Sequence, residues 1–264
     1  MTPLNIKLAA MTINWANPKG DGLIPFLKEV KEAGYEGVSG FADSHWAEQM
    51  ANPKEFGQQL ADEGLELASM DIVSACDIDL VKTICESMAY LNCKHLVCLG
   101  GVGTAADDYP ELAPVLERIG EISLSFGIKT AYHNGRTQET IANMETVLAH
   151  ASPDKVFAMC DTGHATRDFV ELPHPERAPH FMRKHWDRLD FIEFKDWNEE
   201  TDLNTPVGDG LCDWEAVFDL IKEKEYEGWV LVEQNGHEDP TSKGRTPLEC
   251  AKISREFIRN GLGV

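Results

Sequence analysis

Long apolar runs are missing from this chain of 264 residues. No stretch approaches the roughly 20 apolar residues that a membrane-spanning helix needs, and residues 1–7 lack the charged and apolar regions of a signal peptide. The seven cysteines are an odd number without the spacing of a disulfide framework, which favours reduced, mostly buried thiols. These absences predict a cytoplasmic protein without a membrane partner.

Positive charge is also scarce. The chain has 24 Lys and Arg residues against 45 Asp and Glu residues, which gives a formal net charge of −21. Proteins that bind nucleic acid usually present a basic surface to the phosphates, so we expect no nucleic-acid partner. The same charge weakly disfavours a heavily phosphorylated substrate, although a local cluster of Lys or Arg could outweigh it. Solubility is a plainer explanation for part of the acidity.

No complete dinucleotide-binding fingerprint is present. Residues 100–103 read Gly-Gly-Val-Gly, but the rest of the Gly-x-Gly-x-x-Gly pattern at the start of a helix is missing. Linkers, repeats and low-complexity segments are absent too, and a composition of 42% hydrophobic and 26% charged residues is that of a globular protein. We expect one domain over residues 1–264, because α/β barrels of about 250 residues form single domains.

Strand-like and helix-like segments alternate along the whole chain. Strands are predicted at residues 7–12, 36–41, 65–71, 95–99, 128–133, 156–161, 191–196 and 229–233. Apolar residues recur at helical spacing at residues 23–33, 53–63, 79–91, 112–126, 138–150, 178–185, 214–223 and 247–260. Gly34, Gly64 and Gly127 follow three of these helices, where left-handed geometry favours glycine. This α/β alternation predicts a single (β/α)8 TIM barrel rather than an open, doubly wound sheet.

Four predicted strands in the second half of the chain end in groups that can bind a divalent metal. These groups are His133, Asp161, Glu193 and Glu233. The carboxyl ends of the strands in a parallel barrel meet at one rim, where the active site of this architecture lies. We therefore expect an enzyme. For Glu193, the alternative is an ion pair with Lys195 or Arg188, because an isolated carboxylate in the barrel wall would be costly; for Asp161 and Glu233, it is helix capping.

Several short motifs, in their order along the chain, resemble those of a known family. They are Ile13-Asn14-Trp15, Ala33-Gly34-Tyr35-Glu36-Gly37, Asp161-Thr162-Gly163-His164, Phe194-Lys195-Asp196, Pro206-Val207-Gly208-Asp209-Gly210 with Asp213-Trp214, and residues 226–233. Each motif is weak alone. Together they resemble the xylose-isomerase-like barrels, the superfamily that includes the sugar phosphate isomerases and epimerases, and are nearest to the inosose dehydratase type. The resemblance covers nearly the whole chain.

The resemblance implies one divalent metal held by a Glu, an Asp, a His and a Glu from strands five to eight. Here His133 stands at the fifth strand and Glu193 at the seventh, so two ligand types have exchanged places beside Asp161 and Glu233. One imidazole and three carboxylates suit Mn²⁺, with Mg²⁺ or Co²⁺ as alternatives. Because the exchange departs from the family pattern, other ligands stay open: Asn134 or Glu139 for His133, and Asp196 for Glu193.

Further residues are candidates for contact with the substrate. The resemblance implies that His164 contacts the substrate and that Lys195 is an acid or an electrostatic partner. Four ring-bearing residues could form an apolar wall for a sugar ring, although packing is an equal alternative for them: Trp15, His45, Trp46 and Trp197. Arg136 could hold a hydroxyl or carboxylate, or lie in solvent. Gly208 and Gly210 predict a tight turn near the pocket.

The chemistry that such a site implies is enolisation of a small keto-cyclitol or keto-sugar. A divalent ion stabilises an enediolate when Glu233 or His133 removes the proton next to the carbonyl. Loss of a β-hydroxyl then gives dehydration, with Lys195 or His164 protonating the leaving oxygen; loss of a glycosidic group from a 3-keto-glycoside is the same step. We expect a metal-dependent carbon–oxygen lyase.

Three alternatives are open. Reprotonation of the enediolate would make the chain a ketose or aldose isomerase or an epimerase. A DNA-repair endonuclease of the same superfamily is disfavoured by the charge and by the missing histidines of a second and third metal site. A non-catalytic ligand-binding barrel is also compatible with the exchange of His133 and Glu193. Barrels of this superfamily often pair, so the resemblance implies a homo-oligomer.

Overall fold

Eight parallel strands close into a barrel in the computed structural model, which describes residues 4–73, 77–99, 109–135, 140–236 and 242–264. The barrel strands are β1 (Ile6–Met11), β2 (Gly37–Phe41), β3 (Glu66–Ile72), β4 (His95–Cys98), β5 (Lys129–Tyr132), β6 (Val156–Asp161), β7 (Leu189–Phe194) and β10 (Gly228–Val232). Each pairs with its neighbours in chain order, and β10 pairs with β1 to complete the ring. The predicted (β/α)8 TIM barrel is confirmed.

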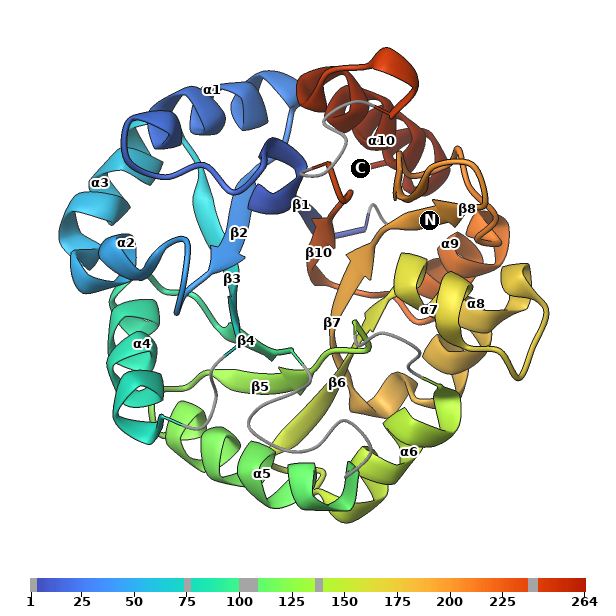
Figure 1. The fold of residues 1–264 in the computed structure, drawn as a ribbon, viewed down its shortest axis with the longest axis horizontal. Helices are drawn as coiled ribbons and strands as arrows, with labels where there is room; N and C mark the ends of the chain where they lie inside the picture. Colours follow the sequence, from blue (N-terminus) through green and yellow to red (C-terminus); the bar gives the residue numbers. More distant parts are fainter. Residues whose placement is uncertain (1–3, 74–76, 100–108, 136–139, 237–241) are drawn as a thin grey trace.

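The helices surround the strands as an outer ring (Figure 1). The longer ones are α1 (Leu23–Ala33), α3 (Pro53–Asp62), α4 (Ile78–Tyr90), α5 (Tyr109–Ser125), α6 (Ile141–His150), α8 (His174–Lys184), α9 (Trp214–Glu223) and α10 (Pro247–Leu262). Local signals fix their ends. At the start of α10, Thr246 and Glu249 form a capping box before Pro247, and Gly34 ends α1 with a φ of 90°. Among the described residues, no helix has the length and apolar character to cross a membrane.

Two apolar layers hold the barrel together. Mostly small or unbranched side chains fill its interior: Ala9, Met11, Ala68, Val97, Ala131, Met159, Phe191 and Leu231. A larger cluster lies between the strands and the helices and contains Leu8, Val38, Ile192 and Val230. Alternate residues of each strand therefore point inward and outward. The inward positions at the C-terminal ends of the strands are left to polar groups.

Two short helices and a β-hairpin were not predicted from the sequence. The short helices α2 (Ala47–Ala51) and α7 (Thr162–Asp168) lie in loops at the C-terminal ends of β2 and β6. The seventh strand ends at Phe194, not at Asp196 as predicted, and the chain continues into an antiparallel hairpin of β8 (Asp196–Asn198) and β9 (Asp202–Thr205). Short 3₁₀ turns complete the connections: η1 (Thr12–Trp15), η2 (Gly20–Gly22), η3 (Trp186–Arg188) and η4 (Ser242–Gly244).

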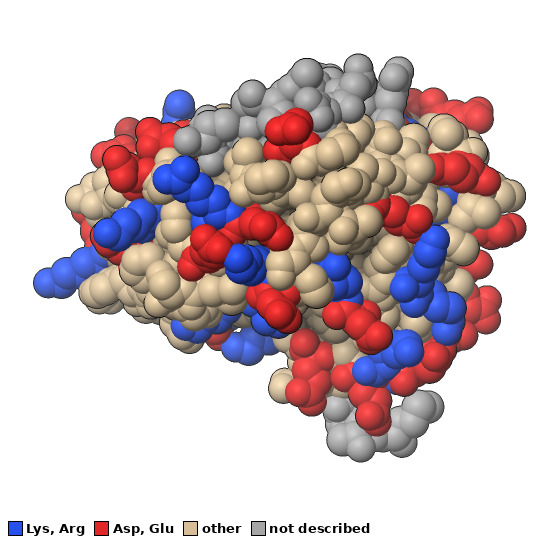
Figure 2. Space-filling model, turned by 90° about the horizontal axis from the view of Figure 1, so that it is seen from below, with Lys and Arg blue, Asp and Glu red and all other residues tan. Residues whose placement is uncertain are grey.

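Acidic and basic side chains lie interspersed on the face of the molecule that Figure 2 shows. Ion pairs at the protein surface include those of Lys155 with Glu121 and of Arg183 with Glu223. The six described cysteines are free and buried, while Cys76 lies outside the described residues. Some of the surface carboxylates are therefore paired locally, while the net charge of the chain remains −21.

Candidate metal centre

Three of the four predicted metal ligands come together inside the C-terminal end of the barrel. His133 directly follows β5, Asp161 ends β6 and Glu193 lies near the end of β7, opposite Asp161 in the sheet register. One potential ligand atom from each residue lies within 4.8 Å of the others. All three residues are buried, with exposed fractions of 4% for His133 and 0% for the two carboxylates. Three consecutive strands therefore supply one compact cluster.

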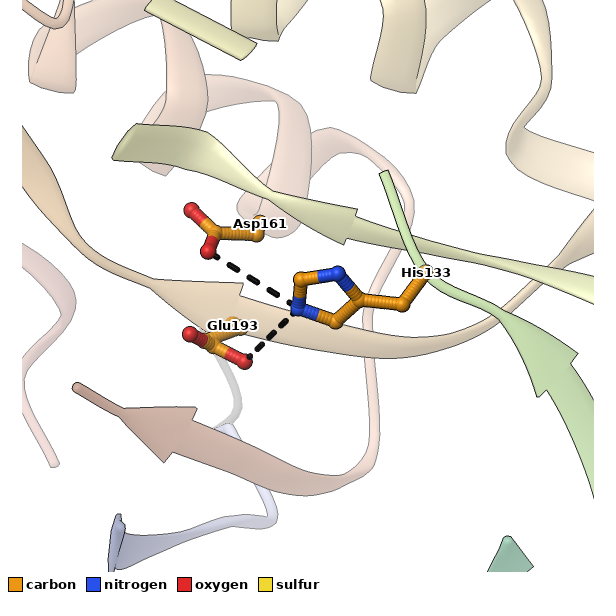
Figure 3. Close-up of side chains that lie close together, drawn as sticks. All are labelled: His133, Asp161 and Glu193. Atoms are coloured by element: carbon orange, nitrogen blue, oxygen red, sulfur yellow. Dashed lines mark ion pairs between the residues drawn. The ribbon is translucent and has the colours of Figure 1, made fainter. Parts of the chain in front are cut away.

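The three side chains point toward one another in Figure 3. His133 Nε2 is 3.5 Å from Glu193 Oε2 and 3.8 Å from Asp161 Oδ2. These separations exceed the length of a hydrogen bond. Within the described part of the chain, Asp161 Oδ2 and both Glu193 oxygens are buried without a hydrogen-bond partner. Such buried acceptors are unfavourable unless something else satisfies them.

A divalent cation fits this donor set. Two ligands at about 2.1 Å from one ion lie roughly 3.0–3.4 Å apart in octahedral or tetrahedral geometry, which is slightly less than the separations seen here. Oxygen donors with one imidazole suit a hard or borderline ion such as Mn²⁺, Mg²⁺ or Co²⁺. The unsatisfied oxygens of Asp161 and Glu193 are the atoms that would hold it.

The protonation states of the cluster are shaped first by burial. Burial lowers the pKa of His133 to about 3, outweighing the opposite effect of Asp161, so the imidazole is neutral, as a metal ligand must be. Burial, with the charges of Glu233 and Asp161, raises the pKa of Glu193 well above its usual range. Burial alone would raise the pKa of Asp161, but the charges of Lys195 and His164 outweigh burial and lower this pKa. A bound cation would favour the ionised form of both carboxyl groups.

Glu233, the fourth predicted ligand, pairs with Lys195 instead of joining the cluster. Its carboxylate accepts a hydrogen bond from Lys195 Nζ, which also lies 3.6 Å from Asp161 Oδ2. Lys195 is 1% exposed. Burial acts to lower its pKa, but Glu233, Asp161 and Glu193 outweigh burial and raise it, so the ammonium group is charged. Glu233 thus borders the cluster through Lys195, and its role as a metal ligand stays a prediction.

The backbone around Lys195 is held by α7. The Thr162 hydroxyl accepts a hydrogen bond from Lys195 N at 3.0 Å and lies 2.7 Å from the Lys195 carbonyl oxygen. A Cβ on Gly163 would lie 2.7 Å from Lys195 Cγ, so only glycine leaves room for this side chain. The Asp-Thr-Gly sequence that begins α7 therefore fixes the entry of Lys195 into the site.

His164 lies beside the cluster, one helical turn from Asp161. Its backbone N–H donates to Asp161 Oδ1 at 2.8 Å, so Asp161 caps α7 with one oxygen and presents the other to the cluster. His164 Nε2 is 3.8 Å from Asp161 Oδ2, and its Nδ1 is 3.3 Å from Asp168. The imidazole ring meets the His133 ring edge to face at 6.0 Å. Contact with a substrate stays a prediction for this residue.

The residues considered as alternative metal ligands make other contacts where the structure describes them. Asn134 is hydrogen-bonded to the backbone of Asp161, with its Oδ1 accepting from Asp161 N at 2.7 Å and its Nδ2 donating to Asp161 O at 3.0 Å. Asp196 accepts hydrogen bonds from the loop that follows β9. Glu139 and Arg136 lie outside the described residues. Among the candidates described, the structure favours His133 and Glu193 as ligands.

The aromatic candidates differ in their surroundings. Trp46 is 0% exposed and packs edge to face against Phe26 and Phe56, so here it is a packing residue and not a wall for a sugar ring. Trp15 donates to Glu29 at 2.7 Å. Trp197 stacks on His174 with ring centroids 4.7 Å apart. The remaining candidate, His45, is partly exposed beside a phenylalanine ring of β2.

One buried acid at the same end of the barrel was given no role by the sequence analysis. Asp71, on β3, is 2% exposed, and its Oδ1 has no hydrogen-bond partner among the described residues. Burial raises its pKa well above the usual range, and Glu233 adds to this effect. The signal that could have identified Asp71 was already present, since it ends a predicted strand as Asp161 does. Asp71 belongs to none of the motifs that carry the resemblance, and the ligand set that the resemblance implies lies in the second half of the chain.

Known proteins share both the sequence pattern and the fold. An inosose dehydratase of Lactiplantibacillus plantarum is 24% identical over 312 aligned positions that cover 98% of this chain and 97% of that protein. An inosose dehydratase of Lacticaseibacillus casei is 28% identical over 171 positions, which cover 58% of this chain and 54% of that relative, or about half its length.

Solved structures give the same architecture. A sugar phosphate isomerase/epimerase from Parabacteroides distasonis superposes with a TM-score of 0.74 at 19% identity, covering 96% of this chain and 93% of that one. At this identity the likeness concerns the fold alone. Residues 27–260 match the family described as xylose isomerase-like TIM barrels, which is most of the chain. With the closed barrel and its site at the C-terminal rim, this match shows that the chain belongs to the xylose isomerase-like TIM barrel family.

Proposed function

We propose that this protein is a divalent-metal-dependent lyase that dehydrates a keto-cyclitol or keto-sugar, either an inosose or a related 3-keto-glycoside. The observation that carries the proposal is the buried cluster of His133, Asp161 and Glu193, whose unsatisfied donor atoms converge at the active-site end of the barrel. The relatives named inosose dehydratase support the choice of substrate class and reaction.

The charges around the cluster suit enolisation. When bound by His133, Asp161 and Glu193, a divalent ion supplies Lewis-acid polarisation of a carbonyl and a neighbouring hydroxyl. Glu233 is the base that removes the proton next to the carbonyl, because its carboxylate borders the cluster without belonging to it. Lys195, charged and hydrogen-bonded to Glu233, holds this carboxylate in place. His133 is the alternative base if it does not bind the ion.

Elimination needs a proton on the leaving hydroxyl. His164 Nε2 lies 3.8 Å and Lys195 Nζ 3.6 Å from Asp161 Oδ2, so both border the cluster, and either can donate that proton. The proton taken from carbon goes to the base, the carbon–oxygen bond breaks, and the departing hydroxyl leaves as water. If no group leaves, the same enediolate is reprotonated, and the enzyme is an isomerase or epimerase.

The isomerase or epimerase is the second candidate function. It is supported by the structural likeness to a sugar phosphate isomerase/epimerase, although that likeness concerns the fold. Both reactions share the first step, so only the products separate them. Incubation with keto-inositols, 3-keto-glycosides and free ketoses in D₂O, read by mass spectrometry, distinguishes the outcomes. Loss of water indicates the lyase, and deuterium incorporation without loss indicates the isomerase or epimerase.

Metal content is the decisive first measurement. We expect the purified protein to bind about one Mn²⁺ per chain, and Asp161→Ala to lower metal affinity and turnover by at least about 100-fold. The matched control is Asp209→Ala, which removes a partly exposed carboxylate paired with Arg245. Normal metal content and turnover in Asp161→Ala would contradict the proposed site. A protein that binds sugars without metal or turnover would instead be the non-catalytic barrel.

A further inference from the structure

Asp71 points into the barrel at the end that holds the candidate metal centre. Its neighbours on β3, Met70 and Ile72, belong to the outer apolar cluster, so the alternation of the strand turns Asp71 inward. Its register partner on β4, Val97, belongs to the inner cluster. Both relationships place the Asp71 carboxyl group inside the barrel and not between strands and helices.

Among the buried acids of the described chain, Asp71 is the one whose side chain has neither a hydrogen bond nor an ion-pair contact; Glu193, whose oxygens also lack hydrogen bonds, lies 3.5 Å from His133. The buried acids are Asp71, Asp161, Asp190, Glu193, Asp196 and Glu233. Asp161 caps a helix, Asp190 pairs with His95, and Glu193 lies against His133. Asp196 accepts a hydrogen bond from Trp214, and Glu233 accepts one from Lys195. Within the described residues, no hydrogen bond or ion pair involves the side chain of Asp71, and its Oδ1 is buried and unsatisfied. A buried acid without a partner is unfavourable, so an external partner is expected.

The strand order places Asp71 on the wall that faces the metal cluster. In the ring β1-β10-β7-β6-β5-β4-β3-β2, strand β3 lies diametrically opposite β7, which carries Glu193. Asp71 is still near enough to interact electrostatically with Glu233, Lys195 and Asp161. The three cluster residues thus lie on one side of the barrel mouth and Asp71 on the other.

We propose that Asp71 is a substrate-binding residue that hydrogen-bonds a hydroxyl group on the side of the substrate turned away from the metal. The inference rests on the proposed function, because it needs a polyhydroxy ring or chain held by the cluster on the opposite wall. A hydroxyl can donate to a carboxylate or accept from a carboxylic acid, so either protonation state of Asp71 can make this bond.

A second metal is a poorer partner for Asp71. Among the described residues, the one group of histidine, cysteine and acid side chains close enough to share an ion is His133, Asp161 and Glu193, and Asp71 is not in it. A single carboxylate does not supply a metal site. A hydroxyl group needs no further ligands, and a sugar or cyclitol provides several of them.

The test measures binding, and does not depend on turnover. Mn²⁺-loaded wild type, Asp71→Asn and Asp71→Ala are titrated calorimetrically with 2-keto-myo-inositol, D-fructose and myo-inositol. For the probe that binds wild type best, we expect Kd to rise about 10- to 100-fold in Asp71→Ala, the usual effect of losing a hydrogen bond to a charged group. Metal content should be unchanged. The same titrations are repeated with forms of that probe that each lack one hydroxyl group. One of these monodeoxy forms should bind wild type more weakly than the full probe does, but should bind Asp71→Ala as well as the full probe does.

Thermal unfolding separates a binding role from a structural role. Replacing an unpartnered buried acid with its isosteric amide removes an unfavourable charge, so Tm of ligand-free Asp71→Asn should be equal to or above that of wild type. The matched control is Asp190→Asn, which removes a buried acid that is paired at the opposite end of the barrel. It should lower Tm and leave Kd unchanged.

The outcomes distinguish this inference from the proposed function. An unchanged Kd in Asp71→Ala, or a lowered Tm with loss of Mn²⁺ in both Asp71 variants, overturns the role of Asp71 while the metal site stands. A wild type that binds a probe without needing Mn²⁺ contradicts the proposed function, and the Kd comparison still decides the role of Asp71. If no probe binds wild type, the inference is overturned as well.

Discussion

His133 and Glu193 are the donor types that the resemblance implies for a metal site, but the imidazole follows β5 and the carboxylate lies on β7 instead of the reverse. Their facing atoms are 3.5 Å apart, and neither Glu193 oxygen has a hydrogen-bond partner among the described residues. The exchange is tolerable because β5 and β7 both flank β6, which carries Asp161. The His133 ring also lies close against Gly135, where a Cβ would be 2.3 Å from the ring. An imidazole therefore fits at this position only with a glycine two residues later.

The exchange can be tested by reversing it. His133→Glu leaves no imidazole in the predicted set, and Glu193→His gives it two, so each single variant should lower Mn²⁺ affinity by at least about 10-fold. The double variant restores one imidazole and should recover affinity beyond the sum of the single effects, as coupled residues do. Isothermal titration with Mn²⁺ measures all four proteins. Additive losses would show that the two residues do not share an ion.

For single residues, the sequence predicted which side chains lie at strand ends, but it could not predict which of these side chains contact one another. Three of the four predicted ligands meet because consecutive strand ends converge, and that follows from the architecture. The pairing of Glu233 with Lys195 depends on side-chain conformation, for which the sequence has no pattern. The orientation of Trp46 could not be predicted either, because an aromatic side chain near the rim can turn toward the core, as Trp46 does, or toward a substrate.

The hairpin of β8 and β9 is organised by one buried carboxylate. Asp196 accepts hydrogen bonds from the backbone N–H groups of Trp197, Gly208, Gly210 and Cys212 and from the indole of Trp214, at 2.7–3.3 Å. A Cβ on Gly210 would lie 2.1 Å from Asp196 Oδ1, so the glycine lets the backbone approach the acid. The predicted turn at Gly208 and Gly210 therefore wraps around Asp196.

Removing this carboxylate should unfold the loop without emptying the metal site. Asp196→Ala leaves five donors without their acceptor, and we expect the free energy of unfolding to fall by about 3 kcal/mol or more. Asp209→Ala, in the same loop but at the surface, should change it by less than about 1 kcal/mol. Chemical denaturation gives both values. Loss of bound Mn²⁺ from folded Asp196→Ala would instead favour Asp196 as a metal ligand.

Long elements were predictable and short ones were not. The bounds of α1 and α9 match the predicted ranges, because each helix presents a continuous apolar stripe; in addition, Gly34 ends α1 and Asp213 caps the start of α9. By contrast, α8 begins earlier than predicted, since Pro175 and Pro179 obscure its first turns. The β8–β9 hairpin and α7 are too short for periodicity to show, and their stability comes from tertiary hydrogen bonds such as those of Asp196 and Thr162.

Buried acidic groups lie at both ends of the barrel, with opposite consequences for stability. At the C-terminal end, Glu193 and Asp71 have raised pKa values because burial disfavours their charged forms. At the N-terminal end, Asp190 lies 2.7 Å from His95 Nδ1 and 3.0 Å from Lys129 Nζ, linking the starts of β7, β4 and β5. The unsatisfied buried acids at the C-terminal end reduce the stability of the fold, whereas Asp190 at the N-terminal end is satisfied and joins the starts of three strands.

The pH dependence of stability should reflect the contacts of Asp190 with His95 and Lys129 at the N-terminal end of the barrel. Burial would raise the pKa of Asp190, but the hydrogen bonds and charges of His95 and Lys129 outweigh burial and lower it. A lowered pKa in the folded state stabilises the protein above the unfolded value of about 3.9, and this contribution is lost as pH falls through the folded value. Asp190→Asn should therefore cost about 1–3 kcal/mol near neutral pH and progressively less in acid.

The difference in unfolding free energy between wild type and Asp190→Asn reports the contribution of Asp190 alone. Glu193 and Asp71 have raised pKa values, so their protonation as pH falls relieves their unfavourable burial, which is an effect of the opposite sign. Because both groups are present in wild type and in Asp190→Asn, their effects cancel in the difference. Denaturant titrations of both proteins at a series of pH values between about 7 and 3 should give converging curves below the usual carboxyl pKa of about 3.9. A difference that stays constant over this range would mean that Asp190 contributes through packing and not through its charge.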